Sequence, residues 1–160
     1  FPDLWESFLA PIPPVERGDL ISAYHRRLTG TDKAEQLKAA KAWSIWEGST
    51  ITLRPNKDIA RSHADDHFAL AFSRIENHYF VNGGFFDVED RLLLDAHKLR
   101  AIPGVIIQGR YDICTPATTA WDLHKAWPEA EFHFVDDAGH AFDEPGILDQ
   151  LIAATDKFAG

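Results

Sequence analysis

Two short stretches that are typical of strands, each leading to a polar loop residue, constrain the fold of this chain most. Residues 102–108 are mostly apolar and lead through a Gly-Arg-Tyr turn to Asp112. Residues 131–135 form a second short run, and His140 follows it after a glycine. Helical sequence separates the two runs and also follows the second. Strands that alternate with helices predict βαβ units and a parallel sheet, so we expect an α/β fold here.

Asp112 and His140 are the first candidates for chemistry. A right-handed crossover brings the carboxyl ends of parallel strands to one edge of the sheet, where open α/β sheets bind ligands. We therefore expect the two side chains to meet. In a Ser-His-Asp triad the acid accepts the imidazole N–H, and the histidine takes the proton of the nucleophile. The alternative is that Asp112 caps the helix near Thr115 and Pro116, while His140 simply follows a glycine turn.

The first half of the chain shows apolar residues at helical spacing. Thr31 or Asp32 is expected to cap a helix, and Asp32 has Glu35 at the capping-box offset. Residues 48–62 are polar and irregular, and we expect a loop there. The expected strands cover residues 105–108 and 132–135. The expected helices cover residues 15–28, 32–47, 65–81, 88–99, 116–127 and 147–158.

The sequence also indicates a piece of a longer protein. It contains no methionine and opens on Phe1. Two parallel strands with no further sheet would be poorly covered, because parallel sheets are normally buried on both faces. We therefore expect a fragment or a processed product.

Two glutamates lie among aromatic residues and are candidates for ligand binding. Glu76 sits on the apolar side of the expected helix 65–81. The apolar residues of this stripe are Phe68, Phe72, Ile75, Tyr79 and Phe80. A carboxylate there is costly without a partner. It would bind a cationic group of a ligand, or it would form an ion pair with an Arg or Lys such as Arg74. The third alternative is that this face of the helix is turned more to solvent. Glu47 ends the preceding helix beside two tryptophans, where an amine could bind or the acid could simply be solvated.

His63 and His67 have the i,i+4 spacing that binds metals on a helix. No third ligand is evident, and acids lie between them, so we interpret this stretch as the solvated start of a helix and expect no metal. Cys114 lies two residues after Asp112 without a Gly-rich setting that would activate it. We interpret it as a small packing residue.

Composition excludes several classes of function. The formal net charge of −9 leaves no cationic face for nucleic acid or for anionic lipid. No apolar run approaches the length of about 18 residues that a membrane span needs. A single cysteine excludes an internal disulfide and fits the cytoplasm. The sequence does not indicate an oligomeric state.

Several longer motifs resemble one enzyme family over nearly the whole chain. They occupy residues 43–48 (Trp-Ser-Ile-Trp-Glu-Gly), 74–80 (Arg-Ile-Glu-Asn-His-Tyr-Phe), 109–112, 120–128 and 139–140. These stretches look like the C-terminal half of proline iminopeptidases (prolyl aminopeptidases). Those are α/β-hydrolase serine peptidases that release an N-terminal proline from peptides.

The resemblance implies a partial α/β-hydrolase fold. Residues 1–91 would form a mostly helical cap, and residues 92–160 would form the last two parallel strands of the core with their helices. It implies that Asp112 is the triad acid and His140 the triad base. It also implies that Glu76 and Glu47 bind the free amino end of a peptide that begins with proline. No cofactor is implied, and the partner would be the missing N-terminal part of the core.

The departures from the family pattern bear on activity. No Gly-x-Ser-x-Gly elbow for a nucleophile and no His-Gly-Gly-type loop for an oxyanion hole occur in the sequence. Cys114 stands one position earlier than the family would place it, with Thr115 directly before Pro116. We therefore expect this chain to be inactive alone. The alternatives are another α/β hydrolase that acts on an ester or amide, or a non-catalytic binding module.

Overall fold

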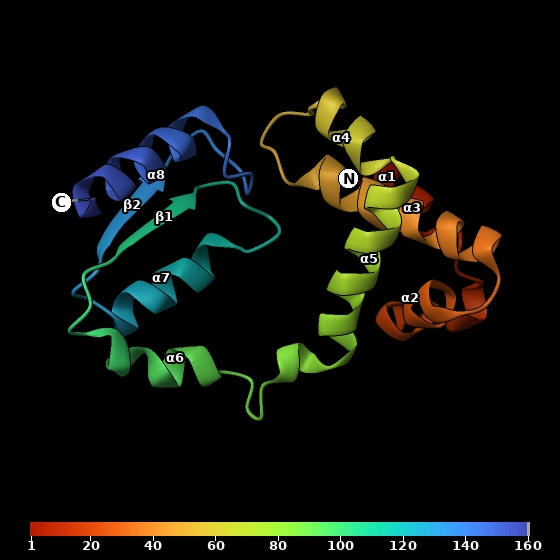
Figure 1. Cartoon of the computed structure of the whole chain (residues 1–160), viewed down its shortest axis with the longest axis horizontal. Helices are drawn as coiled ribbons and strands as arrows, with labels where there is room; N and C mark the ends of the chain where they lie inside the picture. Colours follow the sequence, from red (N-terminus) through yellow and green to blue (C-terminus); the bar gives the residue numbers. More distant parts are fainter. Residues whose placement is uncertain (160) are drawn as a thin grey trace. The chain divides into compact units, whose positions relative to one another are not determined.

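The computed structural model describes residues 1–159 and divides into two compact units (Figure 1). The first unit comprises residues 1–50 and 55–86. The second comprises residues 51–54 and the chain from Asp87 onward. The main change of unit thus falls five residues before the boundary expected from the sequence. The assignment of the two parts as cap and core stays a prediction.

The first unit is helical. Its helices are α1 (Pro2–Leu9), α2 (Leu20–Thr29), α3 (Lys33–Thr50), α4 (Lys57–His63) and α5 (Asp66–Val81). Asp32 caps α3 as predicted, because its Oδ1 accepts hydrogen bonds from the backbone N–H groups of Ala34 and Glu35 at 2.9 and 3.1 Å. Asp65 caps α5 in the same way through the N–H of Phe68. Local polar side chains therefore set where these helices begin.

An aromatic cluster forms the centre of the first unit. Phe8, Tyr24 and Trp43 are buried and contact one another, with ring centroids 4.8 Å apart for Phe8 and Tyr24 and 5.1 Å apart for Tyr24 and Trp43. The Tyr24 hydroxyl donates to the Phe8 carbonyl oxygen, so the polar end of this buried ring is satisfied. Burial raises the pKa of Tyr24 well above its usual value. The cluster joins α1, α2 and α3 into one core.

The structure corrects the predicted loop at residues 48–62. Helix α3 continues to Thr50, and α4 begins at Lys57. The side chain of Asn56 caps α4 by accepting from the N–H groups of Asp58 and Ile59. Helix α4 has few apolar residues, so no apolar periodicity marks it in the sequence. The short helix α1 was not predicted either.

The predicted apolar side of α5 is also wrong in part. The buried residues of this helix are Ala69, Ser73 and Asn77. Ser73 donates to the Ala40 carbonyl at 2.9 Å, and Asn77 donates to the Ile21 carbonyl at 3.0 Å. Small and hydrogen-bonding side chains let α5 pack closely on α3 and α2. As a consequence, four large apolar residues of the predicted stripe are exposed: Phe68, Ile75, Tyr79 and Phe80.

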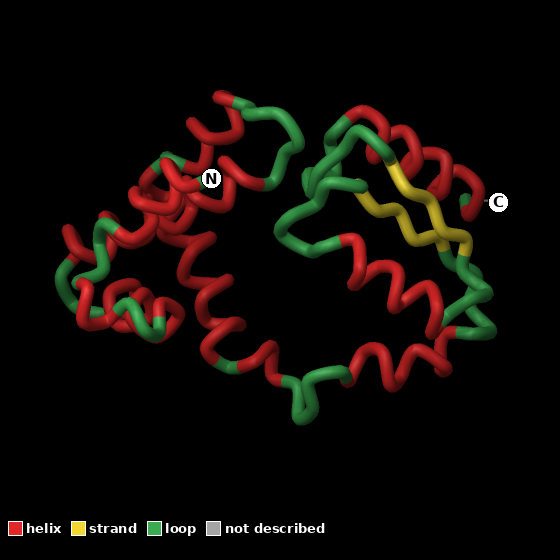
Figure 2. The backbone as a smooth tube through the Cα atoms, turned by 180° about the vertical axis from the view of Figure 1, so that it is seen from behind, coloured by secondary structure: helices red, strands yellow, loops and turns green. Residues whose placement is uncertain are grey.

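The second unit contains the predicted parallel strands. Its elements are α6 (Arg91–Asp95), β1 (Val105–Gly109), α7 (Ala117–Ala126), β2 (Glu131–Val135) and α8 (Pro145–Phe158). Strands β1 and β2 pair in parallel, from Val105 opposite Glu131 to Gly109 opposite Val135. Helices α7 and α8 lie on either side of the strands (Figures 1 and 2). The helix predicted at 88–99 is a short α6 followed by a 3₁₀ turn at Ala96–Leu99.

The core of the second unit is small. Val135, Ala138 and Ile147 are buried there, and Ile107 and Leu151 pack against them. None of the helices in residues 1–159 is both long enough and apolar enough to cross a bilayer.

Gly109 allows the end of β1 and the loop after β2 to approach each other closely. A Cβ atom at Gly109 would lie 1.8 Å from the carbonyl oxygen of Gly139. That oxygen belongs to the backbone beside His140, and it cannot rotate away as a side chain would. Glycine at position 109 therefore permits the loop after β2 to lie against the end of β1.

We predict that Gly109→Ala destabilises the chain by about 1–3 kcal/mol, because overpacking against backbone atoms forces the two loops apart. Urea unfolding monitored by circular dichroism measures the effect. Gly18→Ala is the matched control, since a Cβ atom there would meet no atom within 4 Å. Equal stability of the two variants would contradict the predicted close approach.

Candidate active site

Asp112 is the centre of the site, in the loop that follows β1. Its Oδ1 accepts hydrogen bonds from the backbone N–H groups of Cys114 and Thr115, both at 2.9 Å. Its Oδ2 accepts from the Thr115 hydroxyl at 2.8 Å, from Gln108 Nε2 at 3.2 Å and from His140 Nδ1 at 2.9 Å. The side chain is only 5% exposed. A buried carboxylate needs donors of this kind to remain charged.

The hydrogen bonds determine the charge of this carboxylate. Burial raises the pKa of Asp112, but hydrogen bonds from the Thr115 backbone, from His140 and from the Thr115 hydroxyl together outweigh that effect. The net pKa lies below the usual value of an aspartate. Asp112 is therefore ionised at neutral pH and acts as a pure acceptor.

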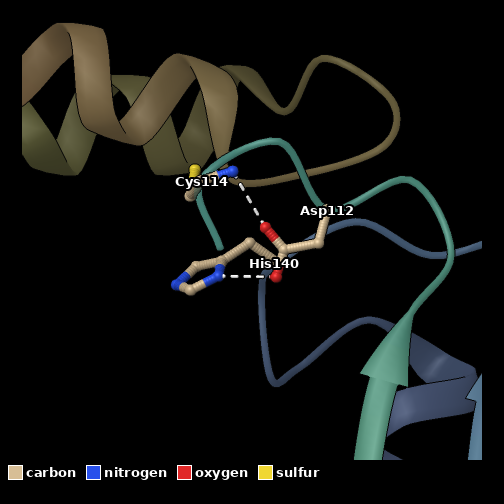
Figure 3. Close-up of side chains that lie close together, drawn as sticks. All are labelled: Asp112, Cys114 and His140. Atoms are coloured by element: carbon tan, nitrogen blue, oxygen red, sulfur yellow. Dashed lines mark hydrogen bonds and ion pairs between the residues drawn. The ribbon is translucent and has the colours of Figure 1, made fainter. Parts of the chain in front are cut away.

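His140 lies in the loop after β2, and its side chain is 40% exposed. Figure 3 shows its ring beside the Asp112 carboxylate. Because an ionised carboxylate only accepts, His140 donates its Nδ1–H, and the basic lone pair is then on Nε2. The predicted meeting of an acid and a histidine at the strand ends is present in the structure. An imidazole held in this way can accept a proton at Nε2 and return it.

Backbone hydrogen bonds hold the two loops together. Arg110 N–H donates to the Val135 carbonyl at 2.9 Å, and Tyr111 N–H donates to the Ala138 carbonyl at 3.0 Å. These bonds continue the pairing of β1 and β2 beyond the strands. They fix the chain leading to Asp112 relative to the chain leading to His140.

Residues 51–54 support the histidine loop from a distant part of the sequence. The Ile51 carbonyl accepts from the N–H groups of His140 and Ala141 at 2.8 and 2.9 Å. Glu144 accepts from Leu53 N–H at 2.9 Å through Oε1 and from Gly139 N–H through Oε2. These long-range contacts could not be predicted, because residues 51–54 carry no motif.

Asp112, Cys114 and His140 each offer one ligand atom, and these atoms lie within 4.8 Å of one another (Figure 3). Both Asp112 oxygens already accept N–H or O–H donors, and His140 already donates its Nδ1–H to one of them. A metal ion would have to displace these bonds. The arrangement therefore fits an acid–base pair better than a metal centre.

The structure separates His63 from His67. His63 is the last residue of α4, whereas His67 lies in α5, so the two do not share a helix. His63 is buried, and its Nδ1–H donates to the Ser44 carbonyl at 2.8 Å. Burial lowers its pKa, and the Ser44 hydrogen bond offsets this effect only in part. The interpretation of this stretch as a solvated helix start is wrong for His63, which is a neutral packing residue.

The two glutamates lie in the first unit. Glu76 is half-buried in α5, and its Oε2 accepts a hydrogen bond from Trp43 Nε1 at 2.5 Å. Trp43 is itself buried in the aromatic cluster. Glu47 is half-buried in α3, one turn after Trp43, and the helix does not end there as predicted.

Comparisons with known proteins bear on the site. A family model described as "alpha/beta hydrolase fold" matches residues 1–143. A proline iminopeptidase of Xanthomonas citri is 60% identical over 99% of this chain and 51% of its own length. The corresponding values are 53%, 98% and 42% for a proline iminopeptidase of Arabidopsis thaliana, and 44%, 98% and 49% for one of Neisseria gonorrhoeae. The chain spans about half the length of the curated relatives it matches.

We predict that Asp112 contributes to stability in a pH-dependent way. Because its folded-state pKa is lowered, its contribution is complete above the unfolded pKa of about 3.9 and is lost as the pH falls through the folded-state value. Wild type should therefore exceed Asp112→Asn in stability at pH 7, and the difference should shrink toward pH 3. Urea unfolding at several pH values measures it. Asp149→Asn, at an exposed position on α8, is the control and should show no such trend.

Proposed function

Because the chain belongs to the alpha/beta hydrolase family, we propose that it is the C-terminal part of a serine peptidase that releases N-terminal proline from peptides. The hydrogen bond between Asp112 and His140 carries this proposal. It gives the chain an oriented base at the carboxyl ends of parallel strands, where hydrolases of this fold do their chemistry. The proline iminopeptidases among its relatives supply the proposed reaction.

In the proposed reaction His140 moves the proton. A serine from the N-terminal part of the hydrolase core attacks the carbonyl carbon of the N-terminal prolyl residue, and its proton passes to Nε2 of His140. The imidazolium then gives this proton to the departing amine as the C–N bond breaks. Water hydrolyses the acyl-enzyme by the same route. Asp112 stabilises the imidazolium and holds the ring with Nδ1–H toward it.

We assign Glu76 and Glu47 to the amino group of the substrate. The amino group of an N-terminal proline is a secondary ammonium, which a carboxylate binds through charge-assisted hydrogen bonds. Glu76 is supported because a buried indole fixes one of its oxygens. Glu47 is supported by its place one turn after that tryptophan. A blocked amine would lose both the charge and the donors, so these residues would select peptides with a free N-terminus.

The proposed function also implies a partner chain segment and a cellular compartment. The partner is the N-terminal part of the hydrolase core, which would add the serine and further strands beside β1 and β2. We place the protein in the cytoplasm, because a chain with one cysteine needs no oxidising compartment.

We predict that this chain alone does not cleave proline-naphthylamide, because no Gly-x-Ser-x-Gly elbow occurs in it. A full-length protein that includes the N-terminal part should cleave this substrate. In that protein, Asp112→Asn and His140→Gln should each lower kcat by roughly 10³–10⁴-fold through loss of the oriented base. A fluorogenic or colorimetric assay measures both. Turnover by this chain, with its mass verified, would contradict the proposed division of the site.

A second prediction concerns selectivity. In the full-length protein, Glu76→Gln should lower kcat/KM for the free-amine substrate by roughly 10–100-fold, the scale of a lost charged hydrogen bond. Hydrolysis of an N-acetylated or simple ester substrate should change little. Glu89→Gln, at an exposed position, is the control. Unchanged free-amine selectivity in Glu76→Gln would instead favour a different α/β hydrolase that acts on esters or amides.

A further inference from the structure

The Thr115 hydroxyl lies between the acid and the base of the site. Its Oγ1 is 2.8 Å from Asp112 Oδ2 and 3.2 Å from His140 Nδ1. The same Asp112 oxygen is 2.9 Å from Nδ1. One hydroxyl, one carboxylate oxygen and one ring nitrogen therefore form a closed triangle. In the sequence, Thr115 was named only as a residue near the helix that Asp112 would cap in the alternative to a triad.

The directions of these hydrogen bonds follow from the chemistry of the three groups. Ionised Asp112 can only accept, so the Thr115 O–H donates to Oδ2. A hydroxyl that donates its one proton keeps two lone pairs. A lone pair of Thr115 can then accept from the His140 Nδ1–H, which already points toward Oδ2. Both acceptors require the proton to be on Nδ1, and so both favour the tautomer that leaves Nε2 basic.

The Thr115 hydroxyl has a defined position because hydrogen bonds to Asp112 and Gln108 hold the backbone of Thr115. Its N–H donates to Asp112 Oδ1 at 2.9 Å. Its carbonyl accepts from Gln108 Nε2 at 3.3 Å, and Gln108 is buried at the end of β1. Pro116 follows and restricts the backbone further. The side chain therefore starts from a defined position beside the carboxylate.

We propose that Thr115 is a positioning residue, whose hydroxyl holds the His140 ring in the Nδ1–H tautomer with Nδ1 facing the Asp112 carboxylate. This inference rests on the proposed function of the Asp112–His140 pair. It assigns the role to the hydroxyl alone. The backbone N–H and carbonyl of residue 115 make their contacts whatever the side chain, so loss of the hydroxyl leaves the loop in place.

The test uses the full-length protein with proline-naphthylamide as substrate. Thr115→Val keeps the shape and removes the hydroxyl, and it should lower kcat by roughly 10-fold, the lower end for a hydrogen bond to a charged group. KM should change by less than about two-fold, because the hydroxyl orients the base rather than binding substrate. Thr115→Ser restores the hydroxyl and should retain most of the kcat. Thr115→Ala provides a second deletion in case the valine is poorly accommodated.

Two controls separate the role of the hydroxyl from a loss of structure. Thr155→Val removes a hydroxyl that donates to carbonyl oxygens within α8, and it should leave kcat unchanged. Thr115→Val and Thr115→Ala each lose a hydrogen bond to Asp112, worth about 1 kcal/mol, so their melting temperatures should fall by a few degrees and stay above the assay temperature. Full kcat in both Thr115→Val and Thr115→Ala would overturn the inference, and so would a serine variant as slow as the valine one.

The failure of this inference differs from the failure of the proposed function. If Asp112→Asn and His140→Gln lose activity while both hydroxyl deletions keep it, Thr115 has no positioning role and the proposed function stands. If Asp112→Asn and His140→Gln keep full activity, the acid–base pair itself is not used. In that case the role proposed for Thr115 is wrong as well.

Discussion

The arrangement of the second unit depends on the need of one buried carboxylate for hydrogen-bond donors. Asp112 accepts five hydrogen bonds, two from backbone N–H groups and three from the side chains of Gln108, Thr115 and His140. Burial alone would favour the neutral acid, and these donors reverse that preference. The bonds to Oδ1 shape the loop, and the bonds to Oδ2 reach the end of β1 and the histidine. The hydrogen bonds that stabilise the charge of Asp112 therefore also connect β1, the loop after it and His140.

The loop that carries His140 has a second kind of support, which comes from backbone contacts rather than from Asp112. Close approach at Gly109 brings the backbone beside His140 against the end of β1. Ile51 then accepts two backbone hydrogen bonds from the loop, and Glu144 ties Leu53 to Gly139. Each bond is worth about 1 kcal/mol, but several together leave the loop few alternatives. The position of the imidazole is therefore set by the backbone first and by Asp112 second.

The sequence predicted the second unit better than the first, for physical reasons. An apolar run between Gly104 and Gly109 marks β1, and a short run with two Phe and a Val marks β2. The geometry of parallel strands is then enough to bring Asp112 and His140 together. In contrast, residues 51–54 support the His140 loop through their backbone atoms. Every residue type has these atoms, so the sequence does not indicate the contact. The buried face of α5 was predicted wrongly because it contains Ser73 and Asn77. These polar residues are buried with their side chains hydrogen-bonded to backbone carbonyls, so hydrophobic periodicity does not mark them. The neutral state of His63 likewise depends on burial by distant residues.

In both units a neutral side-chain donor forms a hydrogen bond with the carboxylate that is proposed to function there. In the second unit, Oδ2 of Asp112 accepts from the neutral hydroxyl of Thr115. In the first unit, Oε2 of Glu76 accepts from the neutral indole N–H of Trp43, which the aromatic cluster holds in place. A neutral donor fixes a carboxylate without cancelling its charge, whereas an Arg or Lys would neutralise it. In both units this donor fixes one carboxylate oxygen and adds no positive charge of its own, which suits an acid that is proposed to face a cation, the imidazolium in one unit and the substrate ammonium in the other.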